Sequence, residues 1–62
     1  MIKVTAINNN VFYLNEDNIE KMENVPETII TMSNDRKYMV VESIDEIMDE
    51  IVLFKRRFMK NL

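Results

Sequence analysis

The sequence contains no cysteine, no histidine and no glycine, and only one proline among its 62 residues. Without cysteine it can form no disulfide, and without cysteine or histidine it lacks the soft ligands of most structural metal sites. It also has no histidine or cysteine to serve as catalytic base or nucleophile, Ser33 and Ser43 lack a partner base, and no glycine-rich loop is present to hold a phosphate. The composition therefore predicts a non-enzymatic protein with no catalytic residues, no cofactor and no bound metal.

Long apolar runs and an excess of basic residues are missing as well. No stretch approaches the roughly 20 apolar residues that span a bilayer. The opening MIKVTAINNN lacks the basic-then-apolar pattern of a signal peptide. The net charge of −3 repels the phosphates of nucleic acids. These features predict a cytoplasmic protein that binds no nucleic acid.

The short length limits how much surface the chain can bury. Hydrophobic residues make up 47% and charged residues 31%, which is a globular composition, and residues 1–62 are expected to form one domain. A domain of about 60 residues buries only about 60% of the surface that its unfolded chain exposes, so its stability is marginal. Because disulfides and soft-metal sites are excluded, self-association remains as a source of buried surface, and we expect a homo-oligomer.

The first part of the chain is rich in strand-forming segments. Residues 2–7 alternate apolar and polar side chains and predict a strand, and residues 11–14 predict the returning strand. Asn8, Asn9 and Asn10 supply the turn between them, because asparagine tolerates a positive φ better than any residue except glycine. The chain therefore opens with a predicted β-hairpin.

A second hairpin is predicted from residues 28–33 and 36–41, with Asn34 and Asp35 as a two-residue turn. Segment 15–25 is ambiguous, because apolar residues at every third position fit either a bulged strand or one helical turn. Apolar side chains occur on both faces of these strands. One helix cannot cover two sheet faces, so either the sheet curls into a small barrel or a second copy covers the exposed side.

A strongly amphipathic helix is predicted over residues 44–60. Ser43 and Glu46 match a capping box, in which each side chain accepts a hydrogen bond from the backbone N–H of the other residue. Acidic pairs in the first half have a spacing that could ligate a hard cation, but acidic residues there more often offset the helix dipole. The apolar arc of the helix spans roughly 160°, and its inner stripe is expected to lie in the core: Ile44, Ile47, Met48 and Ile51. Two strand methionines, Met32 and Met39, are also expected in the core.

The predicted fold class is therefore α+β. It consists of a small antiparallel β-meander or partly closed barrel of four to five strands, followed by one C-terminal amphipathic helix. The strands are expected at about residues 2–7, 11–14, 19–24, 28–33 and 36–41.

The C-terminal end of this helix is the candidate interaction surface. Lys55 projects into the apolar arc, where a buried ammonium is costly, so either its stem reaches water or its charge meets an acidic group on a partner. The basic cluster around it suits a membrane surface or an acidic partner, and a solvated helix end is the alternative. We assign the oligomer or partner interface to Phe54, Lys55, Arg56, Arg57, Phe58, Met59, Lys60 and Leu62.

Several strings along the chain resemble the FlbD family of small flagellar proteins, also called SwrD. These are IKVTAIN, FYLN, IEKMENVPETIITMSN and KYMVVES, followed by a helix that contains KRR. The sequence departs from the family pattern at two turns, where Asn9 and Asp35 replace glycine. Both residues tolerate left-handed geometry, so the resemblance of the fold is unaffected.

The resemblance implies a role in swarming motility, in which the protein raises the power of the flagellar motor through contacts with stator proteins. It also implies a location in the cytoplasm, at the inner face of the membrane near the motor. The residues themselves leave an alternative open. This is a small regulatory module that binds nucleic acid or a membrane surface through the basic end of the helix, at Lys55, Arg56, Arg57 and Lys60.

Overall fold

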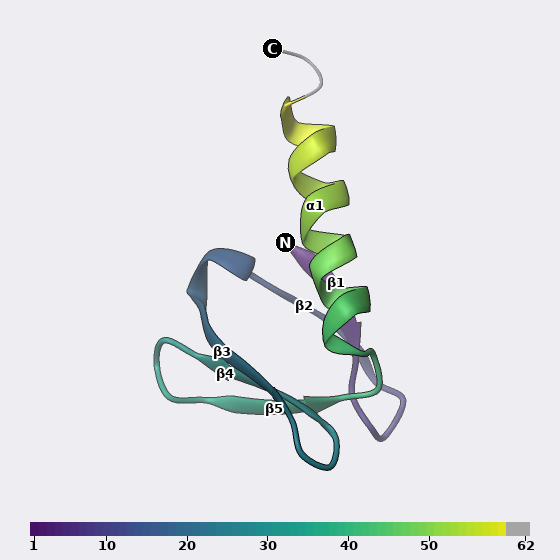
Figure 1. The fold of residues 1–62 in the computed structure, drawn as a ribbon, viewed down its shortest axis with the longest axis vertical. Coiled ribbons are helices and arrows are strands. Elements are labelled where there is room, and N and C mark those ends of the chain that lie inside the picture. The colour runs from purple at the N-terminus through teal and green to yellow at the C-terminus, as the bar shows by residue number, and fades with distance from the viewer. Residues whose placement is uncertain (60–62) are drawn as a thin grey trace.

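The computed structural model describes the backbone of residues 1–59 and the side chains of residues 1–57. The predicted α+β fold class is confirmed, since five antiparallel strands precede one C-terminal helix (Figure 1). Two strands have the predicted bounds, and the other three are shorter by one or two residues. The elements in order are β1 (Ile2–Thr5), β2 (Val11–Leu14), the 3₁₀ turn η1 (Glu16–Asn18), β3 (Ile19–Asn24), β4 (Thr28–Met32), β5 (Lys37–Val40) and α1 (Ile44–Met59).

The first hairpin joins β1 to β2 through a three-residue loop. The N–H of Ala6 donates to the carbonyl of Asn10 at 2.8 Å, so the loop proper is residues 7–9. Asn9 has a φ of 72°, the left-handed geometry expected where it replaces glycine. The side chain of Asn8 accepts a hydrogen bond from the N–H of Asn10 at 3.1 Å and stabilises the turn.

The β4–β5 hairpin repeats this design, and the predicted two-residue turn at Asn34 and Asp35 was wrong. The N–H of Met32 donates to the carbonyl of Arg36 at 2.8 Å, which leaves a three-residue loop. Asp35 has a φ of 69°, and Asn34 accepts from the N–H of Arg36 at 3.1 Å. A left-handed third residue is the usual way for a three-residue loop to restore the strand twist.

The ambiguous segment before this hairpin contains both of the predicted possibilities in succession. The turn η1 comes first, and the side chain of Asn15 caps it by accepting from the N–H of Asp17 at 3.1 Å. Strand β3 then pairs with β4, with a register shift between Ile19 and Lys21 that marks a bulge. The short link from β3 to β4 contains a cis peptide bond before Pro26.

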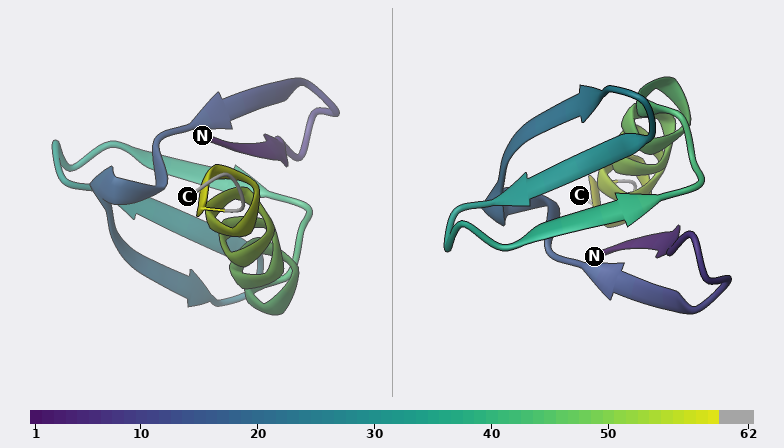
Figure 2. Two further views of the ribbon diagram at one scale, coloured as in Figure 1. Left: turned by 90° about the horizontal axis from the view of Figure 1, so that it is seen from above. Right: turned by 90° about the horizontal axis from the view of Figure 1, so that it is seen from below.

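The strands form two sheets, β1-β2 and β3-β4-β5, which meet at one end. Ala6 bridges to Val40, and the N–H of Val41 donates to the carbonyl of Thr5 at 2.9 Å. Seen along the helix, the strands curl around α1, which packs against β1 and β3 (Figure 2). The described strands do not close into a barrel. The curl and the helix cover the inner sheet faces, and the outer faces remain open.

The core lies between α1 and the concave side of the two sheets. Its central strand residue, Ile30, is fully buried, and the rings of Phe12 and Tyr38 pack at its edge with centroids 5.3 Å apart. The prediction that Met39 and Met48 belong to the core was wrong, because Met39 lies on the outer sheet face and Met48 lies about 100° around the helix from the buried stripe. The core side chains are Ile2, Val4, Leu14, Ile30, Met32, Val40 and Ile47.

Helix α1 begins where the capping box predicts. The N–H of Glu46 donates to the hydroxyl of Ser43 at 3.1 Å, and the N–H of Ser43 donates to the carboxylate of Glu46 at 2.9 Å. These hydrogen bonds, chiefly the one from the Ser43 backbone, lower the pKa of Glu46. The later turns of α1 rise beyond the ends of the strands (Figure 1). Among the described residues, no helix is both long and apolar enough to cross a membrane.

Candidate functional site

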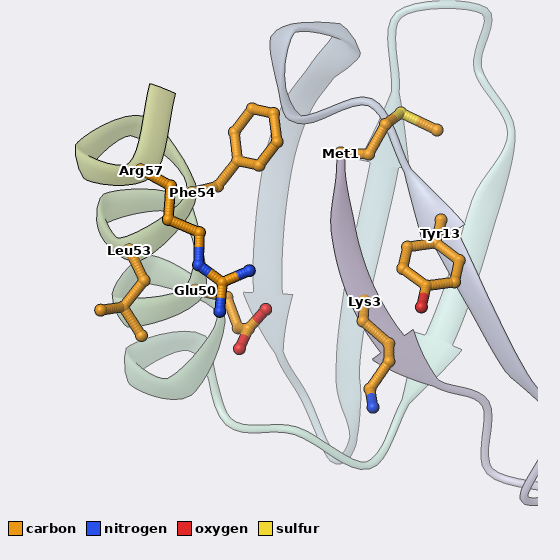
Figure 3. Close-up of a pocket in the computed structure, with 7 residues that line it drawn as sticks. All are labelled: Met1, Lys3, Tyr13, Glu50, Leu53, Phe54 and Arg57. Carbon is orange, nitrogen blue, oxygen red and sulfur yellow. The ribbon is translucent and has the colours of Figure 1, made fainter. Parts of the chain in front are cut away.

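A groove with a volume of about 290 Å³ lies between α1 and the β1–β2 hairpin (Figure 3). It combines aromatic, aliphatic and charged side chains from two segments that are far apart in the sequence. Its lining residues are Met1, Lys3, Tyr13, Glu50, Leu53, Phe54 and Arg57.

The strand register and the helix spacing explain why these residues meet. Lys3 pairs with Tyr13 across the hairpin, and both point away from the core because Ile2 and Val4 take the buried positions beside Lys3. On α1, Glu50 and Arg57 lie seven residues apart and therefore project from the same side of the helix. In Figure 3 Glu50, Phe54 and Arg57 extend from the helix toward the hairpin, whereas Lys3 and Tyr13 extend along the hairpin.

The groove combines apolar side chains with charges of both signs, because Glu50 lines it together with Lys3 and Arg57. Tyr13 is 60% exposed and Leu53 is 54% exposed, whereas Phe54 is half-buried. Among the described side chains, neither Lys3 nor Arg57 makes an ion pair. The lining therefore offers two unpaired cations beside exposed aromatic and aliphatic surface.

A second hollow of about 270 Å³ continues the groove toward the start of the helix and shares Lys3, Glu50 and Leu53 with it. Four carboxylates line this end, Glu42, Glu46, Asp49 and Glu50, and two of them have structural tasks. Glu42 accepts a hydrogen bond from the N–H of Thr5 at 2.9 Å, and Glu46 belongs to the capping box. The groove is thus acidic beside the first turns of α1 and basic beside the C-terminal half of the helix.

The comparisons with known proteins identify the family. A family model described as "FlbD: Flagellar and Swarming motility proteins" matches residues 1–59. The chain belongs to the FlbD family. It is therefore a flagellar and swarming motility protein, and the matched region contains every residue that lines the groove. No curated protein and no solved structure matches the chain significantly.

One end of the groove in this FlbD protein is held by a buried carboxylate. The side chain of Glu16 is only 6% exposed, and its Oε1 lies 2.9 Å from the α-ammonium of Met1. The hydrogen bond from that ammonium is the main cause that lowers the pKa of Glu16, although burial opposes it. The ion pair ties the start of β1 to η1 and so fixes the position of Met1 in the lining.

The predicted interface residues separate into different surroundings. Phe54 and Arg57 line the groove, and Arg56 is exposed on another side of the helix. The Nζ of Lys55 lies 3.7 Å from a carboxylate oxygen of Asp17, so the acidic group that it meets belongs to its own chain. Both side chains of this pair are more than half exposed, and such pairs contribute about 1 kcal/mol or less. The side chains of Phe58, Met59, Lys60 and Leu62 lie outside the described residues.

Two alternative sites of the sequence analysis gain no geometric support. Lys55, Arg56 and Arg57 point in different directions, so they do not form one basic patch for a phosphate backbone or an anionic membrane. Within the described residues, no group of three or more acidic side chains is placed to hold a metal ion.

Sequence reasoning missed the hairpin side of the groove. Lys3 and Tyr13 are polar and aromatic residues on the outer face of a two-stranded ribbon, which is ordinary for a surface strand. One signal was available, since Tyr13 lies between Phe12, which packs against the core, and the core residue Leu14, so its ring must point to the other face of the strand. Its proximity to the helix depends on tertiary packing.

Proposed function

We propose that this FlbD protein acts by binding another protein in the groove between α1 and the β1–β2 hairpin. In this proposal its partner is a component of the flagellar motor associated with the stator, and binding raises motor power during swarming. The protein works in the cytoplasm, at the membrane face of the motor. Family membership supports the motility role, and the composition of the groove supports a protein partner.

The observation that carries the proposal is that exposed Tyr13 and Leu53 lie beside Lys3 and Arg57, two cations that make no ion pair among the described side chains. Tyrosine and arginine are enriched at the energetic centres of protein interfaces. The groove is near the lower limit of small-molecule sites and is open to solvent, so it would leave most of a cofactor exposed. It does accommodate an apolar side chain of a partner, with an acidic group beside it that the two cations can bind.

Deletion of the gene tests the motility role. Cells without the protein should still assemble flagella but should swarm poorly, and the torque of single tethered motors should fall. Loss of the filaments themselves would refute a role in motor power, because the protein would then be needed for assembly.

Point variants test the groove. Tyr13→Ala and Arg57→Glu should each reduce swarming and motor torque while leaving the far-ultraviolet circular dichroism spectrum unchanged, because both side chains are exposed. Arg36→Glu is the matched control, since it makes the same charge change in the exposed β4–β5 loop. Equal effects of Arg57→Glu and Arg36→Glu would show that overall charge matters and the groove does not.

A further inference from the structure

We infer that a second copy of this chain packs antiparallel against the face of α1 that carries Met48 and Val52. In this arrangement, Val52 of one copy meets Val52 of the other, and Asp49 of each copy lies opposite Arg56 of the other. The inference goes beyond the proposed role in motility and does not depend on it.

The face is apolar where a surface helix is ordinarily polar. Met48 and Val52 are 47% and 46% exposed, and they lie one helical turn apart on the same side of α1. The buried stripe is on another side, where Ile47 is 1% exposed. The wheel places Val52 about 140° from Ile47, so no strand of the same copy reaches over it.

Opposite charges lie beside this apolar pair, on one side of it around the helix. Asp49 precedes Val52 by three residues, and Arg56 follows it by four. Both side chains are exposed, and neither makes an ion pair among the described residues. Asp49 and Arg56 are seven positions apart, which keeps both charges on nearly the same side of the helix.

This order of charges makes the face complementary to itself. A two-fold axis near Val52 reverses the direction of the second helix, so the acidic end of one copy faces the basic end of the other. A parallel arrangement would place like charges together, which is unfavourable. A different protein would need a basic and an acidic residue spaced in the matching order along its own surface. A second copy of this chain, running antiparallel, already has that order.

The apolar pair of the dimer face lies outside the main groove, and of the dimer residues only Asp49 borders the second hollow. Glu50 and Arg57 line the groove from one flank of the helix, whereas Met48 and Val52 lie on the other flank. Lys55 reaches Asp17 on that flank and remains paired within its own copy. A dimer would therefore present two grooves, one on each copy.

Charge reversal with rescue tests the inference by sedimentation equilibrium over a wide concentration series. The wild-type chain should form a dimer, and Asp49→Arg or Arg56→Asp alone should weaken it by roughly tenfold or more, because two attractions become two repulsions. The double variant Asp49→Arg/Arg56→Asp should restore the wild-type dissociation constant. Val52→Lys should prevent dimerisation without unfolding the monomer, since Val52 is half exposed.

Matched controls separate a specific face from a general charge effect. Glu27→Arg in the exposed β3–β4 turn and Arg36→Asp in the β4–β5 loop make the same charge changes away from α1, and neither should alter dimerisation. Arg57→Glu should also leave the dimer intact, so a defect in swarming with a normal dimer would concern the groove alone. A wild-type chain that stays monomeric at every concentration overturns the inference, as does a double variant that fails to recover.

Discussion

Truncation of Ile47 to alanine should destabilise the fold far more than the same truncation of its neighbour Met48. Ile47 is 1% exposed and packs from α1 into the core between the two sheets. Met48 is 47% exposed, although both residues lie in the apolar arc of the helix. The pair therefore tests which side of α1 faces the sheets, and it does so with two substitutions that both favour helix formation.

The expected magnitude for Ile47→Ala follows from its burial. Removing three buried carbons costs about 2.4 kcal/mol in transfer free energy, and the cavity raises the loss to about 3–4 kcal/mol. At about 0.05–0.15 kcal/mol per residue, a chain of 62 residues has a free energy of unfolding of about 3–9 kcal/mol. The variant therefore loses a large share of its stability. Met48→Ala should cost less than about 1 kcal/mol.

Urea and thermal unfolding followed by circular dichroism measure both effects. A loss of about 3 kcal/mol should lower the midpoint temperature by about 12–24 °C in a domain of this size. The protein concentration should be low enough to keep the chain monomeric, because Met48 also lies on the proposed dimer face. Equal destabilisation by the two variants, or a larger effect of Met48→Ala, would refute the assigned helix orientation.

Three further predictions concern caps, charge and turns. Ser43→Ala should cost about 1 kcal/mol of unfolding free energy, because the N–H of Glu46 loses its acceptor. The pKa of Glu16 lies below its ordinary value of 4.5, so the Glu16 ion pair stabilises the fold above that pH and is lost as the pH falls through the lower folded-state pKa. Acid titration of Glu16→Gln should therefore show a smaller loss of stability in this range than titration of the wild type. Asp35→Gly should raise stability by up to about 1 kcal/mol in urea unfolding, because glycine adopts the φ of 69° without strain, whereas Asp35→Ala should lower it.

Much of the local structure could be read from the sequence because its determinants are neighbours in the chain. The capping box places the start of α1 through two residues three positions apart. Asn9 and Asp35 mark the left-handed turn positions because no glycine is available. The alternation of apolar and polar residues and the β-branched side chains located the strands, because both signals depend on residues that are close in the sequence. The family resemblance rests on the same strings and is confirmed over residues 1–59.

Loop closure and helix orientation were decided only by tertiary packing. The hairpin at Asn34 closes after three residues because the pairing of Met32 with Arg36 sets the register across two strands. The apolar arc of α1 is wide enough for the helix to pack against the sheets in more than one rotation about its axis. In the structure the side that carries Ile47 faces the sheets, and Met48 is therefore exposed.

The candidate site depends on the tertiary structure most of all. Lys3 and Tyr13 come from the first hairpin and Arg57 from the last described turns of the helix, and packing of α1 against β1 brings them together. Lys55 finds its acidic group on η1 of its own chain for the same reason. The sequence by itself determined each element, its caps and its charged ends, because these depend on near neighbours. The structure decided which elements share a surface, because that depends on burial of apolar area among residues far apart in the chain.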